Sequence, residues 1–288
     1  MQIERHDEPA LFFALVAPFL ERREAQHNLQ LGFRARLEAD RHAFGPRNPL
    51  LYAVLDRPAG EVVAVATQTP PFRLVLSETD DPAVVDAVAD RLLADGVQLP
   101  SASGPVDVVR AFALRWSALT GQMAFVQLDE RIYEATAVVH PEGVPGSMRA
   151  YTWADRPLAI YWLGAFFAEA MPDVPEGRVE QIVEDRAAGI GSLVLWEDEG
   201  EVVSLAGHAG ETPNGSRVGP VYTPPELRGR GYASALTAAL TEQLLAHRRF
   251  CFLFTDLANP TSNSIYQRIG YSPVADVTLW RFAAAGAG

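Results

Sequence analysis

The fold of this chain is decided by one stretch, Val221-Tyr222-Thr223-Pro224-Pro225-Glu226-Leu227-Arg228-Gly229-Arg230-Gly231-Tyr232-Ala233. An apolar run that ends at Tyr222 predicts a strand, and the two prolines after it turn the chain. The apolar period from Tyr232 to about His247 predicts a long helix. The stretch therefore predicts a strand, a glycine-rich loop and a helix in immediate succession.

The glycines and arginines of this loop indicate a site for a diphosphate. The start of a helix presents unpaired backbone N–H groups and the positive end of the helix dipole. Gly229 and Gly231 lack Cβ, so phosphate oxygens can approach the backbone closely. Arg228 and Arg230 can pair with phosphate in a planar, two-donor geometry. On its own, the same pattern also describes a turn in which the glycines only relieve backbone strain.

Two other phosphate motifs do not fit. The dinucleotide fingerprint has a third glycine where this chain has Ser234. A nucleotide phosphate loop and Schiff-base chemistry both need lysine, and the sequence contains none. The single cysteine, Cys251, excludes an internal disulfide and a multi-cysteine metal site. The histidines show no metal-like spacing, so we expect no metal.

A second motif lies downstream, where Phe254–Asn259 reads as a strand followed by a loop. After it, Asn263–Tyr271 reads as a short helix that ends in Tyr-x-x-x-Gly-Tyr. With these motifs, and with Arg228–Ala233 matching the pattern Q/R-x-x-G-x-G/A, the chain resembles the GNAT superfamily of acyl-CoA N-acyltransferases. The clear match covers roughly residues 216–274, and the order of elements extends it over residues 147–282.

The resemblance implies direct transfer of an acyl group, usually acetyl, from acetyl-CoA as cosubstrate to an amine. It implies that the strand ending at Tyr222 diverges from the strand Phe250–Phe254, and that the pantetheine arm pairs with the backbone around Val221–Thr223. The N–H of Val221 would then polarise the thioester carbonyl. The cofactor contacts that we expect are Val221, Tyr222, Thr223, Arg228, Gly229, Arg230, Gly231, Tyr232, Ala233, Ser234, Asn259 and Asn263. For the two asparagines, capping of the short helix is the simpler account.

Tyr266 holds the position of the family's general acid, which protonates the leaving CoA thiolate. A thiol has a pKa of about 8.5 and tyrosine one near 10, so this transfer is mildly uphill at reference values. His208 and Glu211 lie between two central strands, and either could take the proton from an ammonium nucleophile, directly or through water. Their alternative roles are a turn histidine and a solvated carboxylate.

The resemblance implies contacts with the acceptor from the first two helices and the strand-end loops, and the candidates lie on the first helix of the second half. Trp162 and Phe166 share a helix face by their i, i+4 spacing. An aromatic stripe of this kind is also typical of a core. Glu169 could meet a cationic acceptor or stay solvated.

A Pro/Gly-rich linker, residues 141–146, divides the chain into halves with the same order of predicted elements. We therefore predict an α/β (α+β) fold of two tandem GNAT-like domains, residues 1–140 and 147–288. Each should be a mixed, mainly antiparallel central sheet flanked by helices. In the first half the strand Phe72–Leu76 runs into Ser77–Pro82, which has three carboxylates and no glycine. We expect this copy to be degenerate and not to bind CoA.

The composition is that of a globular protein, with 48% hydrophobic and 21% charged residues and a net charge of −12. This charge gives nucleic-acid binding little support, and no apolar run approaches the ~20 residues that span a bilayer. We expect a cytoplasmic monomer or homodimer that acts on a small-molecule or peptide amine. The alternatives are a non-catalytic acyl-CoA sensor or scaffold and, more narrowly, acetylation of an amino-sugar thiol as in mycothiol synthase.

Overall fold

The computed structural model describes residues 1–57, 59–170 and 177–284. The chain forms two compact units, and each contains segments distant in sequence. The N-terminal unit comprises Met1–Ile132, Asp256–Ala258 and the described residues from Val274 onward. The C-terminal unit comprises Tyr133–Thr255 and Asn259–Pro273.

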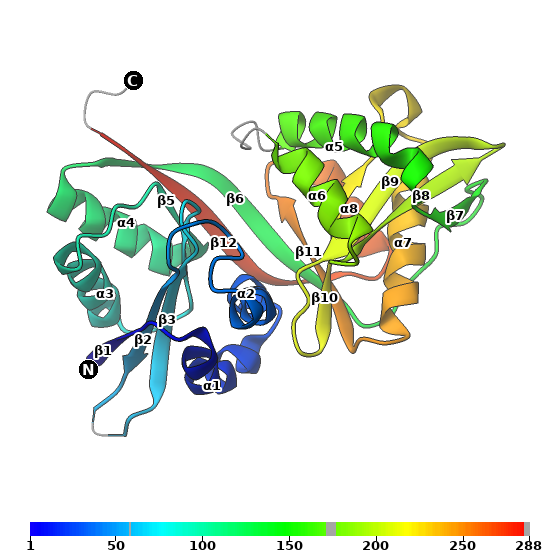
Figure 1. Ribbon diagram of the computed structural model, residues 1–288. Coiled ribbons are helices and arrows are strands. Elements are labelled where there is room, and N and C mark those ends of the chain that lie inside the picture. Colours follow the sequence, from blue (N-terminus) through cyan, green and yellow to red (C-terminus); the bar gives the residue numbers. More distant parts are fainter. Residues whose placement is uncertain (58, 171–176, 285–288) are drawn as a thin grey trace. The chain divides into compact units, whose positions relative to one another are not determined.

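The sheet of the N-terminal unit has the strand order β1-β2-β3-β4-β5-β12-β6. Its strands are β1 (Gln2–His6), β2 (Leu50–Leu55), β3 (Val62–Gln68), β4 (Leu74–Leu76), β5 (Ser101–Pro105), β6 (Met123–Ala135) and β12 (Ser272–Ala283). Its helices are α1 (Pro9–Leu20), η1 (Glu21–Arg23), α2 (Asn28–Ala39), α3 (Pro82–Ala94) and α4 (Val106–Thr120). One apolar cluster joins the sheet to α3 and α4, and another joins it to α1 and α2, so helices cover both faces (Figure 1).

The C-terminal unit repeats this plan with the strand order β11-β10-β9-β8-β7. Its strands are β7 (Ser147–Ala150), β8 (Ser192–Asp198), β9 (Glu201–Ala209), β10 (Gly215–Tyr222) and β11 (Phe250–Asp256). Its helices are η2 (Trp153–Asp155), α5 (Arg156–Ala170), α6 (Arg178–Ala187), η3 (Pro225–Leu227), α7 (Tyr232–Leu245) and α8 (Pro260–Arg268). Here α5 and α6 share one apolar cluster with the sheet, and α7 shares the other.

The pairing pattern of the two units is the same. From β1 to β4 and from β7 to β10 every pair is antiparallel, whereas β4–β5 and β10–β11 are parallel. The predicted α+β class, with mixed and mainly antiparallel sheets, is therefore confirmed. Parallel neighbours need a crossover connection, and α3 and α7 supply it in the two units.

Three details differ from the expectation. The strands Gln2–His6 and Ser101–Pro105 were not predicted, because the second is made of small and polar residues that carry little strand signal. The apolar pattern of Val277–Phe282 predicts a last strand for the second half; it exists within β12 but pairs antiparallel with β5 of the N-terminal unit. The apolar period of residues 176–188 predicts a helix; α6 begins at Arg178, after its N-cap Gly177 with φ of +75°, and Glu176 lies outside the described residues.

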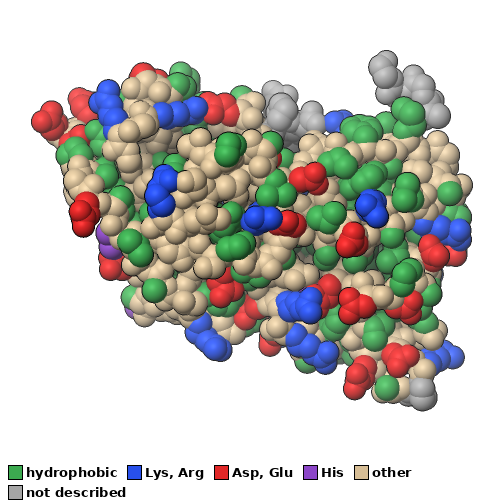
Figure 2. All heavy atoms as spheres, turned by 180° about the vertical axis from the view of Figure 1, so that it is seen from behind, with side chains coloured by type: hydrophobic (Ala, Val, Ile, Leu, Met, Phe, Trp, Pro, Cys, Tyr) green, Lys and Arg blue, Asp and Glu red, His purple; other side chains and the backbone are tan. Residues whose placement is uncertain are grey.

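No helix among residues 1–57, 59–170 and 177–284 is both long and apolar enough to cross a membrane. On the face of the molecule shown in Figure 2, acidic and basic side chains are interspersed.

Candidate active site

The parallel pairing between β10 and β11 is short. It joins Gly215–Arg217 to Phe250–Phe252 and stops there, although β10 continues to Tyr222 and β11 to Asp256. Successive N–H groups of a strand point to opposite edges. Alternate backbone groups of β10 beyond Arg217 therefore face the β11 side without a ladder partner there. This is the divergence of strands that the GNAT resemblance implies.

A β-bulge interrupts β10 at the same level. Val218 pairs with His208 and Val221 pairs with Ala206, so β10 has one more residue than β9 between these pairs. An extra residue reverses the faces on which the later side chains lie. Accordingly, Val218 packs in the α7 cluster and Tyr222 in the α5 cluster. This bulge was not predicted, although a glycine such as Gly219 inside a predicted strand is a usual signal of one.

The loop after β10 has the backbone expected of an anion site. Gly229 and Gly231 have φ values of +79° and +86°, in the left-handed region that favours glycine. Gly231 is the N-cap of α7, and it has no side-chain cap. The first N–H that bonds back within this turn is that of Ala235, to the Gly231 carbonyl at 2.9 Å. The N–H groups of residues 232–234 thus lie at the open end of the helix.

Arg228 contacts its own loop and α5. Its Nε donates to the Thr223 carbonyl at 2.9 Å, and its Nη2 donates to both carboxylate oxygens of Glu169, at 3.0 and 2.8 Å. Its guanidinium also lies 5.7 Å from the centre of the Tyr222 ring. The structure thus pairs an expected cofactor residue with an expected acceptor residue. In this state the Thr223 carbonyl and the Glu169 carboxylate are both engaged by Arg228.

Tyr232 contributes to the site only through its backbone. Its side chain is buried in the α7 cluster, and its hydroxyl donates to Asp198 at 2.6 Å. This hydrogen bond is the main reason that the pKa of Tyr232 is raised. Arg230 lies beside this hydroxyl and favours its ionised form.

Tyr266 lies on α8, half-buried against the α7 cluster. Its ring meets the edge of the Tyr271 ring, with 6.0 Å between the centroids. Burial raises the pKa of Tyr266 to about 12, so the phenol stays protonated at neutral pH. Among the described residues no hydrogen bond to this hydroxyl is formed, which suits a group that meets its partner on a ligand.

The two candidate bases lie toward the other end of β10. His208 is opposite Val218, whereas Tyr222 is opposite Leu205, a shift of three residues or about 10 Å along the strand. Burial lowers the pKa of His208, and its Nδ1 is 3.3 Å from the Ser216 hydroxyl. Glu211, in the β9–β10 turn, forms an ion pair with Arg248. The structure does not bring either residue to the glycine loop.

The asparagines at the start of α8 hold the helix. The Asn259 side chain caps it by accepting from the Ser262 N–H at 3.0 Å. Asn263 donates from Nδ2 to the Asn259 carbonyl at 2.7 Å and accepts at Oδ1 from the Tyr133 hydroxyl at 3.0 Å. These bonds match the capping account of Asn259, and they engage both ends of the Asn263 amide.

The aromatic residues of α5 pack on the end of β10. Trp162 is buried, with its ring centre 6.2 Å from that of Tyr222. Phe166 is half-buried against the same cluster and meets Phe167 edge to face. Trp162 is therefore a core residue, while Phe166 keeps an exposed part. In the described parts of the chain no group of three or more His, Cys, Asp or Glu side chains is arranged to hold a metal ion.

Comparisons with known proteins identify chains with a similar fold. Residues 198–281 match the model of the family described as FR47-like protein. No curated protein sequence matches the chain significantly. The whole chain aligns with a solved GNAT-family acetyltransferase from Colwellia psychrerythraea, at 11% identity and a TM-score of 0.58, covering 98% of this chain and 99% of the other. A GCN5-related N-acetyltransferase from Sphaerobacter thermophilus aligns at 18% identity and a TM-score of 0.61, covering 97% and 95%.

The tandem arrangement has its own solved counterpart. A tandem GNAT protein from the clavulanic acid biosynthesis pathway aligns over 100% of both chains, at 12% identity and a TM-score of 0.55. Residues 198–281 thus resemble the FR47-like family, and the chain as a whole has the tandem GNAT fold. The predicted resemblance to the GNAT superfamily is confirmed, and its fold is one that acetyltransferases use for acyl transfer.

Proposed function

We propose that this protein transfers an acetyl group from acetyl-CoA to a primary amine in a ternary complex. The observation that carries the proposal is the unpaired edge of β10, which is followed, after the loop of residues 223–231, by the open N-terminus of α7. An extended pantetheine arm can pair with such an edge as an added strand does. The diphosphate would then lie at the N–H groups of residues 229–234, where the backbone and the helix dipole favour negative charge.

In the proposed reaction the neutral amine nitrogen attacks the thioester carbonyl carbon and forms the C–N bond. A β10 N–H beyond the bulge, at Val221, stabilises the oxyanion. The C–S bond then breaks, and its electron pair leaves on sulfur. Tyr266 gives its proton to the thiolate, the amine nitrogen loses one proton to a base, and the tyrosinate regains a proton from water.

The pKa of Tyr266 limits how this proton moves. With a phenol pKa of about 12 against about 8.5 for a thiol, complete transfer is uphill by roughly 5 kcal/mol. We therefore assign Tyr266 as a hydrogen-bond donor to the leaving sulfur, with full transfer only as the C–S bond breaks. Its raised pKa keeps the donor protonated across the physiological range.

For the base we favour His208 acting through water. Its lowered pKa leaves the imidazole neutral, and so able to accept a proton, at pH 7. The Glu211 carboxylate is held by Arg248. Since His208 lies about 10 Å along β9 from the residue opposite Tyr222, ordered water must bridge the gap.

The experiment that tests the proposal measures free thiol released from acetyl-CoA with a panel of primary amines. We expect Tyr266→Phe to lower kcat about a hundredfold and to leave the Kd of acetyl-CoA within threefold. Binding of acetyl-CoA without thiol release from any amine would instead identify an acyl-CoA sensor. An amino-sugar thiol in the panel tests the mycothiol-synthase-like alternative.

The pH profile provides a second test. The lowered pKa of His208 predicts that kcat rises with pH on the acidic side, with its midpoint below the usual value of about 6.5. On the basic side Tyr266 keeps its proton until about pH 12, so kcat should not fall between pH 8 and about 10. A basic limb centred near pH 9 would contradict Tyr266 as the acid.

A further inference from the structure

The inference concerns α8, the short helix that carries Tyr266, and it rests on the proposed function of that tyrosine. Tyr133 is the first residue of the C-terminal unit along the chain, and its ring is fully buried, with 1% exposed. Its hydroxyl donates to Asn263 Oδ1 at 3.0 Å and accepts from Gln267 Nε2 at 3.2 Å. One phenol thus holds two side chains of α8.

The two side chains define the rotation of the helix. Asn263 and Gln267 are four residues apart and therefore lie on one face of α8. At about 100° per residue, Tyr266 projects roughly 60° from Asn263 and 100° from Gln267 around the axis. The nine-residue helix cannot set its rotation about its own axis through its internal hydrogen bonds, so contacts with the rest of the unit must set it. Fixing the Asn263–Gln267 face therefore fixes the direction in which Tyr266 points.

The hydrogen bonds around Tyr133 form one consistent network. Because Asn263 Nδ2 donates to the Asn259 carbonyl at 2.7 Å, its Oδ1 is the end that faces Tyr133. The Tyr133 proton points to that oxygen, and the Gln267 amide donates to the phenol oxygen. The Tyr133 hydroxyl thus donates one hydrogen bond to α8 and accepts one from it.

The C-terminal end of α8 is held by the same segment of chain. The Val139 N–H donates to the Ile269 carbonyl at 3.0 Å. Gly270 has φ of +105°, and a Cβ there would lie 2.7 Å from the Ala137 carbonyl oxygen. Residues 133–139, the end of β6 and the segment after it, thus contact α8 in its middle and at its C-terminal end.

We propose that Tyr133 is a positioning residue for catalysis: it sets the rotation of α8, and so the aim of the Tyr266 hydroxyl at the leaving sulfur. Tyr133 does not itself touch the reacting atoms. Removal of its hydroxyl should lower kcat without weakening acetyl-CoA binding, because the hydrogen bonds of that hydroxyl among the described residues are made with α8.

The experiment compares Tyr133→Phe with Tyr52→Phe in the full chain. Tyr52 is an equally buried tyrosine, 1% exposed, whose hydroxyl donates to Asp95 at 2.8 Å in the N-terminal unit. Tyr133→Phe loses two hydrogen bonds with amide side chains and Tyr52→Phe loses one with a carboxylate, so Tm should fall in both. With the best amine of the panel, Tyr133→Phe should lower kcat about tenfold, and Tyr52→Phe should leave it unchanged. The Kd of acetyl-CoA should stay within twofold in both.

Two further measurements separate positioning from general destabilisation. Amide hydrogen exchange within α8 should become several-fold faster in Tyr133→Phe and not in Tyr52→Phe, while exchange in α7 stays the same. The double variant Tyr133→Phe/Tyr266→Phe should be no slower than Tyr266→Phe alone, since Tyr133 acts through Tyr266.

Two kinds of result would contradict the positioning role of Tyr133. Unchanged exchange in α8, unchanged kcat, or additive losses in the double variant would overturn the positioning role while leaving Tyr266 as the acid. If Tyr266→Phe itself retains full activity, the proposed acid is wrong, and the positioning role falls with it.

Discussion

The two parallel crossovers of this molecule, β4-loop-α3 and β10-loop-α7, have the same topology and opposite chemistry. In the C-terminal unit the helix begins at Gly231 with φ of +86° and no side-chain cap. In the N-terminal unit the Asp81 carboxylate caps α3 by accepting from the Ala83 N–H at 2.9 Å, and Pro82 at the first helical position has no N–H. The start of α7 is therefore open to an anion, whereas the start of α3 is already capped by the Asp81 carboxylate.

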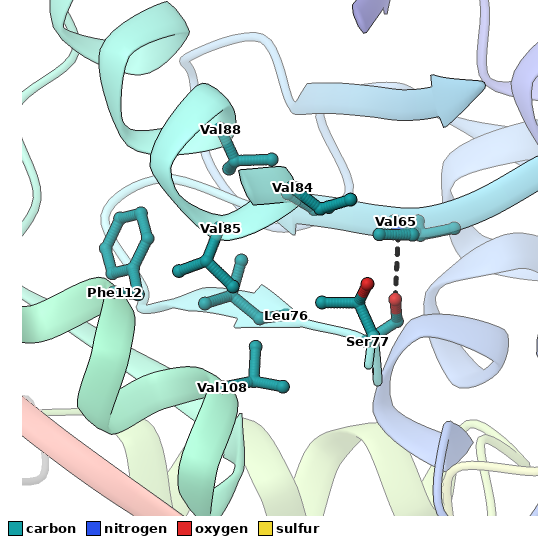
Figure 3. A pocket seen from close by; sticks show the side chains of 11 residues that line it. Val65, Leu76, Ser77, Val84, Val85, Val88, Val108 and Phe112 are labelled. Carbon is teal, nitrogen blue, oxygen red and sulfur yellow. Dashed lines mark hydrogen bonds between the residues drawn. The ribbon is translucent and has the colours of Figure 1, made fainter. Parts of the chain in front are cut away.

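The surroundings of the two loops extend the contrast. Glu78, in the N-terminal loop, is paired with Arg23 and accepts from Gln26 at 3.1 Å. The adjacent Ser77 hydroxyl accepts from the Val65 N–H at 2.8 Å (Figure 3). The small cavity beside them has an almost wholly apolar lining, including Leu76 and Phe112 (Figure 3). The N-terminal loop thus satisfies its polar groups within its own unit, and we propose that this unit does not bind CoA.

The contrast can be tested by placing a carboxylate, as the N-terminal loop has, in the loop between β10 and α7. A Cβ at Gly229 would meet no other atom within 4 Å, and Asp and Asn tolerate the left-handed backbone better than other residues with a side chain. A carboxylate about 5 Å from a phosphate costs about 3 kcal/mol at an effective dielectric of 20. We therefore expect Gly229→Asp to weaken acetyl-CoA binding roughly a hundredfold or more, as measured by calorimetry.

Gly229→Asn is the matched control, because it has the same shape without the charge. It should weaken binding about tenfold at most, through crowding of the backbone alone. Equal affinities for the two variants would show that no phosphate lies near this residue.

A smaller effect is expected at Arg228. Its guanidinium is bound to Glu169 in a pair whose members are each about half exposed, so the pair adds little stability. If the guanidinium turns to a phosphate when CoA binds, Arg228→Ala should raise the Kd of acetyl-CoA about tenfold, with a salt dependence weaker than that of the native protein. Loss of stability without loss of affinity would assign Arg228 to the fold alone.

Glu169→Gln tests the same contact between Arg228 and phosphate by changing the partner of Arg228 in the ion pair. The substitution keeps the size of the side chain and removes the charge that competes with phosphate for Arg228. Acetyl-CoA should then bind equally well or up to about threefold more tightly. A weaker affinity would mean that Glu169 orients Arg228 for the phosphate.

The sequence predicted the elements better than their partners. The loop from Arg228 to Ala233 could be assigned because turn chemistry and helix termini are local properties. The pairing of β12 with β5 could not be predicted, because the apolar pattern of Val277–Phe282 indicates a strand but not which strand lies beside it. In both units the antiparallel strands and the crossover helix repeat, whereas β12 lies beside β5, and the end of β6 from Tyr133 belongs to the C-terminal unit.

In the candidate site, too, local motifs could be predicted from the sequence and long-range contacts could not. Tyr266 and the glycine loop were predicted from motifs. The Arg228–Glu169 pair joins residues far apart in sequence, and each had been assigned to a different ligand. Tyr133 was not singled out at all, because a buried tyrosine in a strand has no local signal that shows what its hydroxyl meets. Long-range side-chain partners of this kind need the tertiary structure.

The smallest expected effect on binding is at Asp81. Asp81→Ala removes the cap of α3 and should lower the free energy of unfolding by about 1 kcal/mol, whereas Asp81→Asn keeps a capping side chain and should cost only a few tenths. Calorimetry should give one acetyl-CoA per chain for the native protein and for both variants. The Asp81 carboxylate is only one of the features that we expect to prevent CoA binding in this unit, because Pro82 still lacks an N–H and the loop still has no glycine. Two acetyl-CoA molecules on the native chain would refute the degenerate N-terminal unit; two on Asp81→Asn alone would show that a single charge, and not the backbone, excludes the ligand.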